Sequence, residues 1–408
     1  MKRPLLPPIP PATPPIVRSY LDALDRLQQR ETLKPVQVTE RAQHLLDEYL
    51  GPRTVGVEAA FAHGRLSVLG DHTDHFDGFA LMRPLMHGQA VAVRPADGPV
   101  RVVLEGAGAW TWTADMPEAD LPVEVRLLAH LVRPWLPPGQ GVDAAVAGSV
   151  PLFCPEARLG ALGMAAARAL QALLARPEDE AALVRHVREA LRAATGRDTS
   201  PAYLLGSDTA PEASFLLCDT RRLEHLPVEV PGVQKPGWGL LAVPAPAVDL
   251  RAERQRIERA GAALDLLRRR GFPELTSFRD LEHRDLERAL GLLPRRYRPL
   301  VRHLVTQNRY VPRMVQAIRR ADWQLFGTLL LMSHASFRDD WHDTTPEIDF
   351  VVEQVRALSL EGLYGAHRTG RGGGVLIVGQ PFQIPGALDA LQDAFAARFG
   401  TRPEALLL

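Results

Sequence analysis

The spacing of apolar and polar residues predicts a mixture of short strands and amphipathic helices. Alternating apolar positions predict strands at residues 55–60, 66–69, 89–94, 100–104, 214–218, 240–243 and 375–378. Helical periodicity predicts helices at residues 19–31, 39–50, 159–174, 180–194, 251–270 and 387–399, with further helices dominating between 271 and 358. Because strands and helices are intermingled without a regular βαβ repeat, an α+β fold is expected.

The length and punctuation of the chain predict its division into domains. With 408 residues it is long enough for two or three domain-sized units. The proline-rich start predicts an extended, mobile tail over residues 1–18. We expect an N-terminal domain over 19–225 and a C-terminal domain over 226–408.

Composition narrows the class of protein. Apolar residues make up 46% and charged residues 24%, as in ordinary globular proteins. The formal net charge is zero, which argues against nucleic acid and anionic membranes as partners. Prolines interrupt the apolar start, and no apolar run reaches about 18 residues, so a soluble cytoplasmic protein is expected.

One polar segment, GDHTDHFDG, stands out after an apolar run. It gathers Asp71, His72, Asp74, His75 and Asp77 in one predicted turn. Short acidic and imidazole side chains on a loop suit hydrogen bonding to sugar hydroxyls. His72 and His75 flank Asp74 and would also suit a metal ion, but no third ligand cluster is evident, so no metal site is predicted. A polar turn that caps a helix is the simpler alternative.

The surrounding sequence resembles a known family. GRLSVLGDHTDHFDGFAL, residues 64–81, is similar in register to the segment G-R-V-N-L-I-G-E-H-T-D-Y-N-G-G of galactokinases, which are GHMP small-molecule kinases. Ser333–Glu353 and Gly365–Val378 resemble two further motifs of that family. The resemblance implies a two-domain GHMP-kinase-like fold, with a mixed-sheet N-terminal domain and an α+β C-terminal domain.

The same resemblance implies roles for individual residues. Arg65 takes the position of the arginine near the transferred phosphate. Asp71, His72 and Asp74 take the positions that bind galactose hydroxyls. Asp71 replaces the usual glutamate and is shorter by one methylene. An active member of the family would use ATP and Mg²⁺ as cofactors.

The phosphate-binding motif of the family, P-x-G-x-G-L-S-S-S-A, is altered in this chain. Its glycines let backbone N–H groups approach the phosphates at a helix N-terminus. Here Phe153 and Pro155 replace the glycines, and Pro155 also removes a backbone donor. Glu156 adds negative charge, and residues 157–159 replace the serines. Arg158 has the chemistry to grip a phosphate, yet the loop is predicted to be degenerate.

The catalytic base is also predicted to be replaced. Counting back without gaps from the strand before Arg221 places the base aspartate of the family at Tyr203. Asp198 and Asp208 lie five residues away, which on a helix means about 140° and about 7.5 Å. Losing a general base typically costs about 10²–10⁴ in rate.

A glycine-rich turn near the C-terminus has two interpretations. Gly370 and Gly372 match positions that contact the nucleotide in the family, but the turn also suits a simple tight connection into a strand.

Three hypotheses about function follow. In the first, the chain is a catalytically impaired galactokinase homologue that binds galactose or a related sugar as a sensor, or binds a protein partner. In the second, it is a working sugar kinase with an altered site built from Arg65, Arg158 and Arg371. In the third, it is a structural or interaction protein whose sugar motif is a remnant.

Overall fold

The computed structural model describes residues 34–52, 56–113, 115–137, 139–210, 215–232, 235–244 and 249–408. The chain forms two compact units. Unit 1 contains Val230–Val248 and Pro312–Leu408, and unit 2 contains Leu33–Glu229 and Asp249–Val311. The predicted tail over 1–18 and the predicted helix over 19–31 lie outside the described residues. The domain boundaries predicted near residue 225 stay a prediction.

Unit 2 is built on a seven-stranded mixed sheet. Its strands are β1 (Glu58–Leu69), β2 (Phe79–Asp97), β3 (Val100–Leu104), β4 (Gly108–Trp112), β5 (Gln140–Gly148), β6 (Phe215–Asp219) and β7 (Glu224–Val228). The order is β4-β3-β5-β2-β6-β7, with β1 paired to β2. Strands β3 and β5 run parallel, whereas the other pairs are antiparallel.

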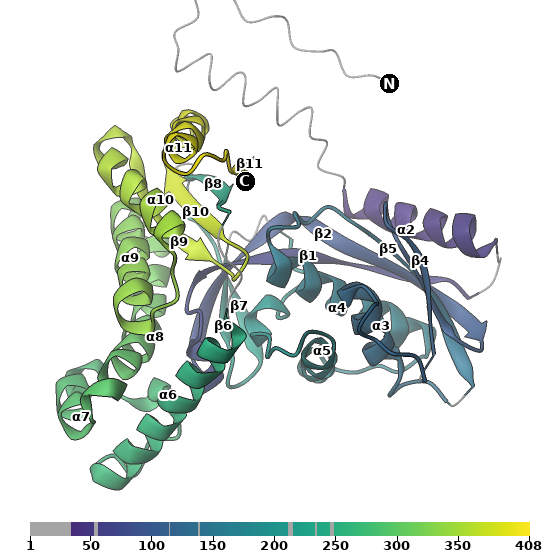
Figure 1. The fold of residues 1–408 in the computed structure, drawn as a ribbon, viewed down its shortest axis with the longest axis horizontal. Coiled ribbons are helices and arrows are strands. Elements are labelled where there is room, and N and C mark those ends of the chain that lie inside the picture. Colours follow the sequence, from purple (N-terminus) through teal and green to yellow (C-terminus); the bar gives the residue numbers. More distant parts are fainter. Residues whose placement is uncertain are drawn as a thin grey trace, which may run out of the picture. The chain divides into compact units, whose positions relative to one another are not determined.

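Helices cover both faces of this sheet. The helices α3 (Val123–Val132), α4 (Pro155–Leu173) and α5 (Glu180–Thr195) lie on one face, and α2 (Pro35–Leu50) lies on the other (Figure 1). Successive side chains of a strand point to opposite faces. Accordingly, Val91 and Val93 of β2 pack in the core beneath α3–α5, and Ala90 and Ala92 pack beneath α2.

Further helices of unit 2 follow the sheet in sequence. They include α6 (Leu250–Arg270), α7 (Leu286–Leu292) and the first part of α8 (Arg298–Arg319). Short 3₁₀ turns include η1 (Thr73–Phe76), η2 (Pro201–Tyr203) and η4 (Phe278–Asp280). The carboxylate of Asp249 caps α6 by accepting hydrogen bonds from the amides of Arg251 and Ala252, at 2.9 and 3.1 Å.

Unit 1 combines a four-stranded antiparallel sheet with helices. The sheet order is β11-β8-β10-β9, from β8 (Gly237–Ala242), β9 (Leu363–Thr369), β10 (Gly374–Gly379) and β11 (Glu404–Leu407). Its helices include α9 (Trp323–Ser336), α10 (Pro346–Ala357) and α11 (Ile384–Phe399), with a π-helical turn η7 (Phe337–Trp341) and a 3₁₀ turn η8 (Leu358–Glu361). Gly327 lets α9 lie close to β9, because a Cβ there would sit 1.9 Å from the Tyr364 carbonyl oxygen.

The α+β class expected from the sequence is confirmed, and the limits of several elements differ. The strands predicted at 55–60 and 66–69 are parts of the single strand β1, which passes through Gly64. The strand predicted at 89–94 is the second half of β2, which continues through Pro84 and Gly88. Within the described residues, no helix is both long and apolar enough to cross a bilayer.

Candidate functional site

The predicted sugar-binding segment forms a compact turn between β1 and β2. Gly70 leaves β1 with φ +92°, and a Cβ there would lie 2.3 Å from the Phe79 carbonyl oxygen, so the position requires glycine. His72 and Asp77 flank η1 in the left-handed region, with φ of 69° and 56°. Non-glycine residues rarely adopt this conformation, and they do so mostly where the surrounding structure enforces it.

Hydrogen bonds from inside and outside the turn enforce it. The Thr73 hydroxyl donates to the carbonyl oxygens of Gly70 and Phe79, at 2.7 and 2.9 Å. On α8, the Asn308 side chain accepts from the Phe79 amide at 3.0 Å. Gly78 fits closely between these groups, because a Cβ would approach the Thr73 side chain to 2.4 Å and Asn308 Oδ1 to 2.6 Å.

An arginine on η4 braces the end of the turn. Arg279 donates two hydrogen bonds to the Asp219 carboxylate, at 2.7 and 2.9 Å, and one to the Asp77 carbonyl oxygen at 3.3 Å. Its guanidinium lies 3.8 Å from the centre of the Phe79 ring. Burial would raise the pKa of Asp219, but hydrogen bonds, first of all from Arg279, outweigh it and hold that pKa below its ordinary value.

The three predicted sugar-binding residues share this turn. His72 is buried, whereas Asp71 and Asp74 are half-buried. The Asp71 atom Oδ2 is buried and has no hydrogen-bond partner among the described residues. An ionised carboxylate only accepts hydrogen bonds, so this oxygen suits a hydroxyl donor. The His72 ring is stacked near that of His75, with centroids 6.1 Å apart, and lies 6.5 Å from that of His303.

Arg65 lies in the second half of β1 and is fully buried. Its guanidinium donates to the carbonyl oxygens of Gly64 at 3.3 Å and Leu205 at 3.5 Å. Burial lowers its pKa to about 10, so it stays charged at neutral pH. The Nη2 atom is buried and has no hydrogen-bond partner in the described part of the chain. A buried cation of this kind favours an anion beside it.

Tyr203 lies in η2, two residues before Leu205, whose carbonyl oxygen accepts a hydrogen bond from Arg65. It is 5% exposed, and a Cβ added to Gly160 of α4 would come within 3.1 Å of its carbonyl oxygen. The two neighbouring aspartates pair with other arginines. Asp198 bonds Arg188 at 3.0 Å, and Asp208 lies 3.5 Å from Arg168.

One acidic residue near Arg65, Glu180, gave no signal in the sequence. Glu180 begins α5, accepts from the Gly206 amide at 2.8 Å and pairs with His225 at 3.1 Å. Burial opposes its charge, but the His225 and Gly206 hydrogen bonds lower its pKa, and the same contact raises the pKa of His225. In the sequence Glu180 looks like an ordinary first-turn acid of a helix. Only the packing of α5 brings it near Arg65.

The predicted phosphate loop forms a tight turn at the start of α4. The Cys154 amide donates to the Pro151 carbonyl oxygen at 3.0 Å, and the Arg158 amide donates to Cys154 at 2.9 Å. Pro155 occupies the first helical position and has no N–H. Phe153 is half-buried within the turn. Neither Cys154 nor Pro155 at this helix start therefore offers an amide to a ligand.

The charged residues of this helix start are arranged unfavourably for an anion. Glu156 lies in the first turn, where its charge opposes the attraction that a helix N-terminus exerts on anions. The Arg158 guanidinium bonds the carboxylate of Glu124 on α3. Arg158, which the sequence suggested as a phosphate ligand, is therefore paired with Glu124.

The remaining motifs lie in unit 1. Gly370 and Gly372 belong to the turn between β9 and β10, and Gly370 has φ +61°. Arg368 bonds the Gly370 carbonyl oxygen at 2.7 Å and the Asp343 carbonyl oxygen at 2.6 Å. These contacts tie the turn to the segment between η7 and α10.

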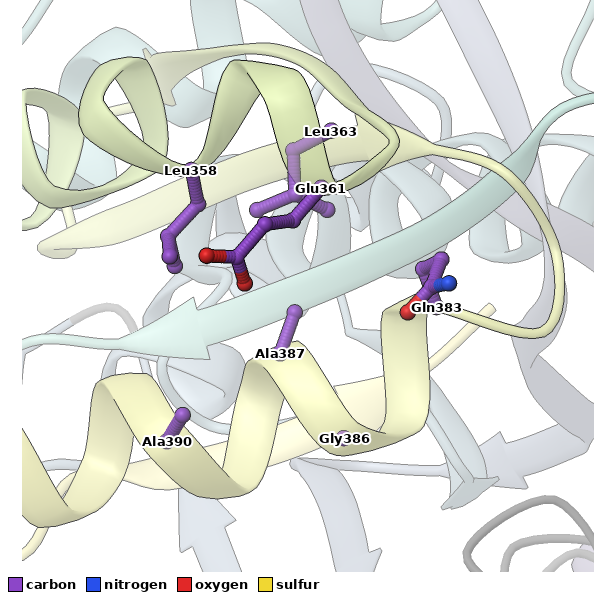
Figure 2. A pocket seen from close by; sticks show the side chains of 7 residues that line it. All are labelled: Leu358, Glu361, Leu363, Gln383, Gly386, Ala387 and Ala390. Atoms are coloured by element: carbon purple, nitrogen blue, oxygen red, sulfur yellow. The ribbon is translucent and has the colours of Figure 1, made fainter. Parts of the chain in front are cut away.

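Unit 1 also contains a pocket between η8 and α11. Glu361 and Leu358 project from η8 toward Ala387 of α11, and Gln383 lines the same space (Figure 2). None of the predicted site residues lines it. The chemistry of the candidate site therefore lies elsewhere, at the turn after β1 and the start of α4.

Comparison with solved structures defines the class of fold. A crystal structure of Lactococcus lactis galactokinase complexed with galactose matches with a TM-score of 0.78, at 19% identity, covering 90% of this chain and 96% of that one. The mevalonate kinase of L. major matches with a TM-score of 0.56, at 13% identity, covering 87% and 95%. The fold is that of the GHMP small-molecule kinases.

Sequence comparison gives the particular family. The galactokinase galactose-binding signature matches residues 53–95. A galactokinase of Streptomyces coelicolor is 30% identical over 379 residues, covering 86% of this chain and 91% of the relative. One of Haemophilus influenzae is 29% identical over 335 residues, covering 78% and 83%. The chain belongs to the galactokinase family, as its motifs indicated.

Proposed function

We propose that the protein is a galactokinase-family member that binds galactose or a related sugar but transfers phosphate poorly, and that acts as a sugar sensor or a partner-binding protein in the cytoplasm. The observation that carries the proposal is a contrast between two parts of unit 2. The turn with Asp71, His72 and Asp74 is braced by hydrogen bonds, and Asp71 Oδ2 has an acceptor position to spare. The start of α4 has lost the features that hold a triphosphate.

The residues at the start of α4 do not fit Mg·ATP. Residues 153–159 contain no hydroxyl group for a metal ion. Pro155 and the turn at Cys154 remove amide donors, and Glu156 adds negative charge. Because phosphoryl transfer depends on positioning and charge neutralisation, these changes weaken both nucleotide binding and transition-state stabilisation.

The surroundings of Arg65 support the same proposal. Its hydrogen bonds to Gly64 and Leu205 go to carbonyl oxygens, and the predicted base position holds Tyr203. A phenol ordinarily loses its proton only near pH of about 10, so it is a poor base at neutral pH. Arg65 can still attract an anionic group of a bound phosphosugar.

Calorimetry with galactose and separately with Mg·ATP tests the binding half. We expect heat of binding with galactose and little with Mg·ATP. Asp74→Ala is expected to weaken galactose binding, while Asp97→Asn, an exposed carboxylate at the end of β2, leaves it unchanged. If no sugar binds, or if Asp74→Ala binds as well as the unchanged protein, the sugar motif is a remnant and the interaction hypothesis takes its place.

A coupled ADP-release assay across several hexoses tests the catalytic half. The Streptomyces coelicolor galactokinase, run in the same assay, serves as the positive control. We expect turnover far below that of the control. Turnover of about one per second, which is ordinary for an enzyme, would show instead that the protein is a working sugar kinase with an altered site.

A further inference from the structure

Three potential metal ligands meet beside the sugar-binding turn. His72, His75 and Glu253 each offer one ligand atom, and these atoms all lie within 4.8 Å of one another. The two histidines come from the turn itself, on either side of the start of η1. Glu253 comes from the first turn of α6, far away in sequence. The pairing therefore depends on the fold of unit 2 and is invisible in the spacing of the motif.

The chemistry of this set matches a borderline-soft divalent cation. Two imidazole nitrogens and one carboxylate oxygen are a ligand set that zinc and related transition metals prefer. Glu253 is 6% exposed, so its carboxylate is shielded from water, which strengthens its attraction to a cation. The Nε2 atom of His75 is buried and has no hydrogen-bond partner among the described residues.

The geometry is close to what a metal ion needs. Bonds of about 2.0–2.2 Å in a tetrahedral site place ligand atoms about 3.4 Å apart. Because the three ligand atoms already lie within 4.8 Å of one another, no two of them need to approach by more than about 1.4 Å, which small χ rotations supply. The backbone that carries them is fixed, because the Thr73 hydroxyl ties down the turn and the Asp249 cap ties down the start of α6.

We propose that His72, His75 and Glu253 bind one divalent transition-metal ion, with Zn²⁺ as the best match. Three protein ligands leave at least one coordination position for water or for an oxygen of a polyol. The galactokinase segment carries tyrosine where this chain has His75, so the site is a property of this chain. The proposal concerns metal binding alone and stands whether or not the protein transfers phosphate.

The test uses the full chain without an affinity tag, stripped of metal with a chelator. Zn²⁺ binding is measured by calorimetry, and Co²⁺ binding by its visible d–d absorption, which reports four-coordinate geometry. We expect one ion per chain with a Kd in the micromolar range or below. His75→Tyr and Glu253→Gln should each weaken Zn²⁺ binding more than about 100-fold, because changes to mere outer-shell groups already cost about 10–100-fold.

His44→Ala is the matched control, because His44 lies on α2 with its side chain 79% exposed, 3.6 Å from Glu48. That pair is the kind of surface site that binds metal adventitiously. Circular dichroism confirms that each variant folds. Binding that survives both His75→Tyr and Glu253→Gln, or that His44→Ala abolishes, would overturn the proposal, as would the absence of binding to the unchanged protein.

Discussion

Removing the brace on the sugar-binding turn should cost a measurable part of the protein's stability. Arg279 and Asp219 form a bidentate ion pair, and their side chains are only 18% and 16% exposed. Exposed pairs contribute about 0.2–1 kcal/mol, and breaking a fully buried pair costs about 3–5 kcal/mol. This pair lies between the two limits. Arg279→Met keeps the apolar stem, so we expect a loss of about 2 kcal/mol in the free energy of unfolding.

A double-mutant cycle isolates the ion pair from other contacts of Arg279. The free energy of unfolding in urea is measured for Arg279→Met, Asp219→Asn and the double variant. We expect a coupling energy of about 1–2 kcal/mol. Arg284→Met is the control, because its side chain is 78% exposed and pairs with nearby Glu282, so its effect should stay within about 0.5 kcal/mol. A coupling energy no larger than this control value would refute the reasoning.

Three further predictions rest on single sites. Burial would raise the pKa of Asp280, but hydrogen bonds, first of all that of Thr276, lower it to about 2. The ionised carboxylate therefore stabilises the fold fully above its unfolded pKa of 3.8, and this stabilisation is lost as pH falls through 2. Urea midpoints measured against pH should fall less in acid for Asp280→Asn than for the unchanged protein. Gly78→Ala should destabilise by about 1–3 kcal/mol through overpacking of the turn and weaken sugar binding in calorimetry, whereas Gly261→Ala in α6, with nothing within 4 Å of the added Cβ, should do neither. Burial raises the pKa of the Cys154 and Cys218 thiols to about 12, so neither should react with a thiol reagent at neutral pH before unfolding, and rapid labelling of the folded chain would contradict this.

The class of fold and the place of the sugar-binding turn could be predicted because their signals are local. An apolar run that ends in GDHTDH shows both the strand and the polar turn after it within a few residues. The helices around α4, α5, α6 and α11 were predicted within a few residues of their ends, since each has a continuous periodic face. Pro84 and Gly88 are residues that usually interrupt strands, so the full length of β2 could not be predicted. Pairing with β1 on one edge, and with β5 and β6 on the other, keeps β2 continuous.

The partners of the site residues could not be predicted, because they come from distant parts of the chain. The sequence offers Arg158 as a phosphate ligand, and only the packing of α3 against α4 shows that Glu124 holds it. Similarly, His72 and His75 suggested a metal ion without a third ligand, and α6 supplies Glu253. Asn308 gave no signal at all, although it fixes the Phe79 amide.

The sugar-binding turn and the start of α4 are supported by different residues. Asn308 of α8 and Arg279 of η4 brace the sugar-binding turn. The start of α4 depends instead on its own turn at Cys154 and on the Arg158–Glu124 pair. Energetic effects of substitutions add when the sites share no partners. Under the proposed function, replacing the glycines and serines of the phosphate loop therefore leaves the supports of the sugar-binding turn in place, so that nucleotide binding weakens while sugar binding is kept.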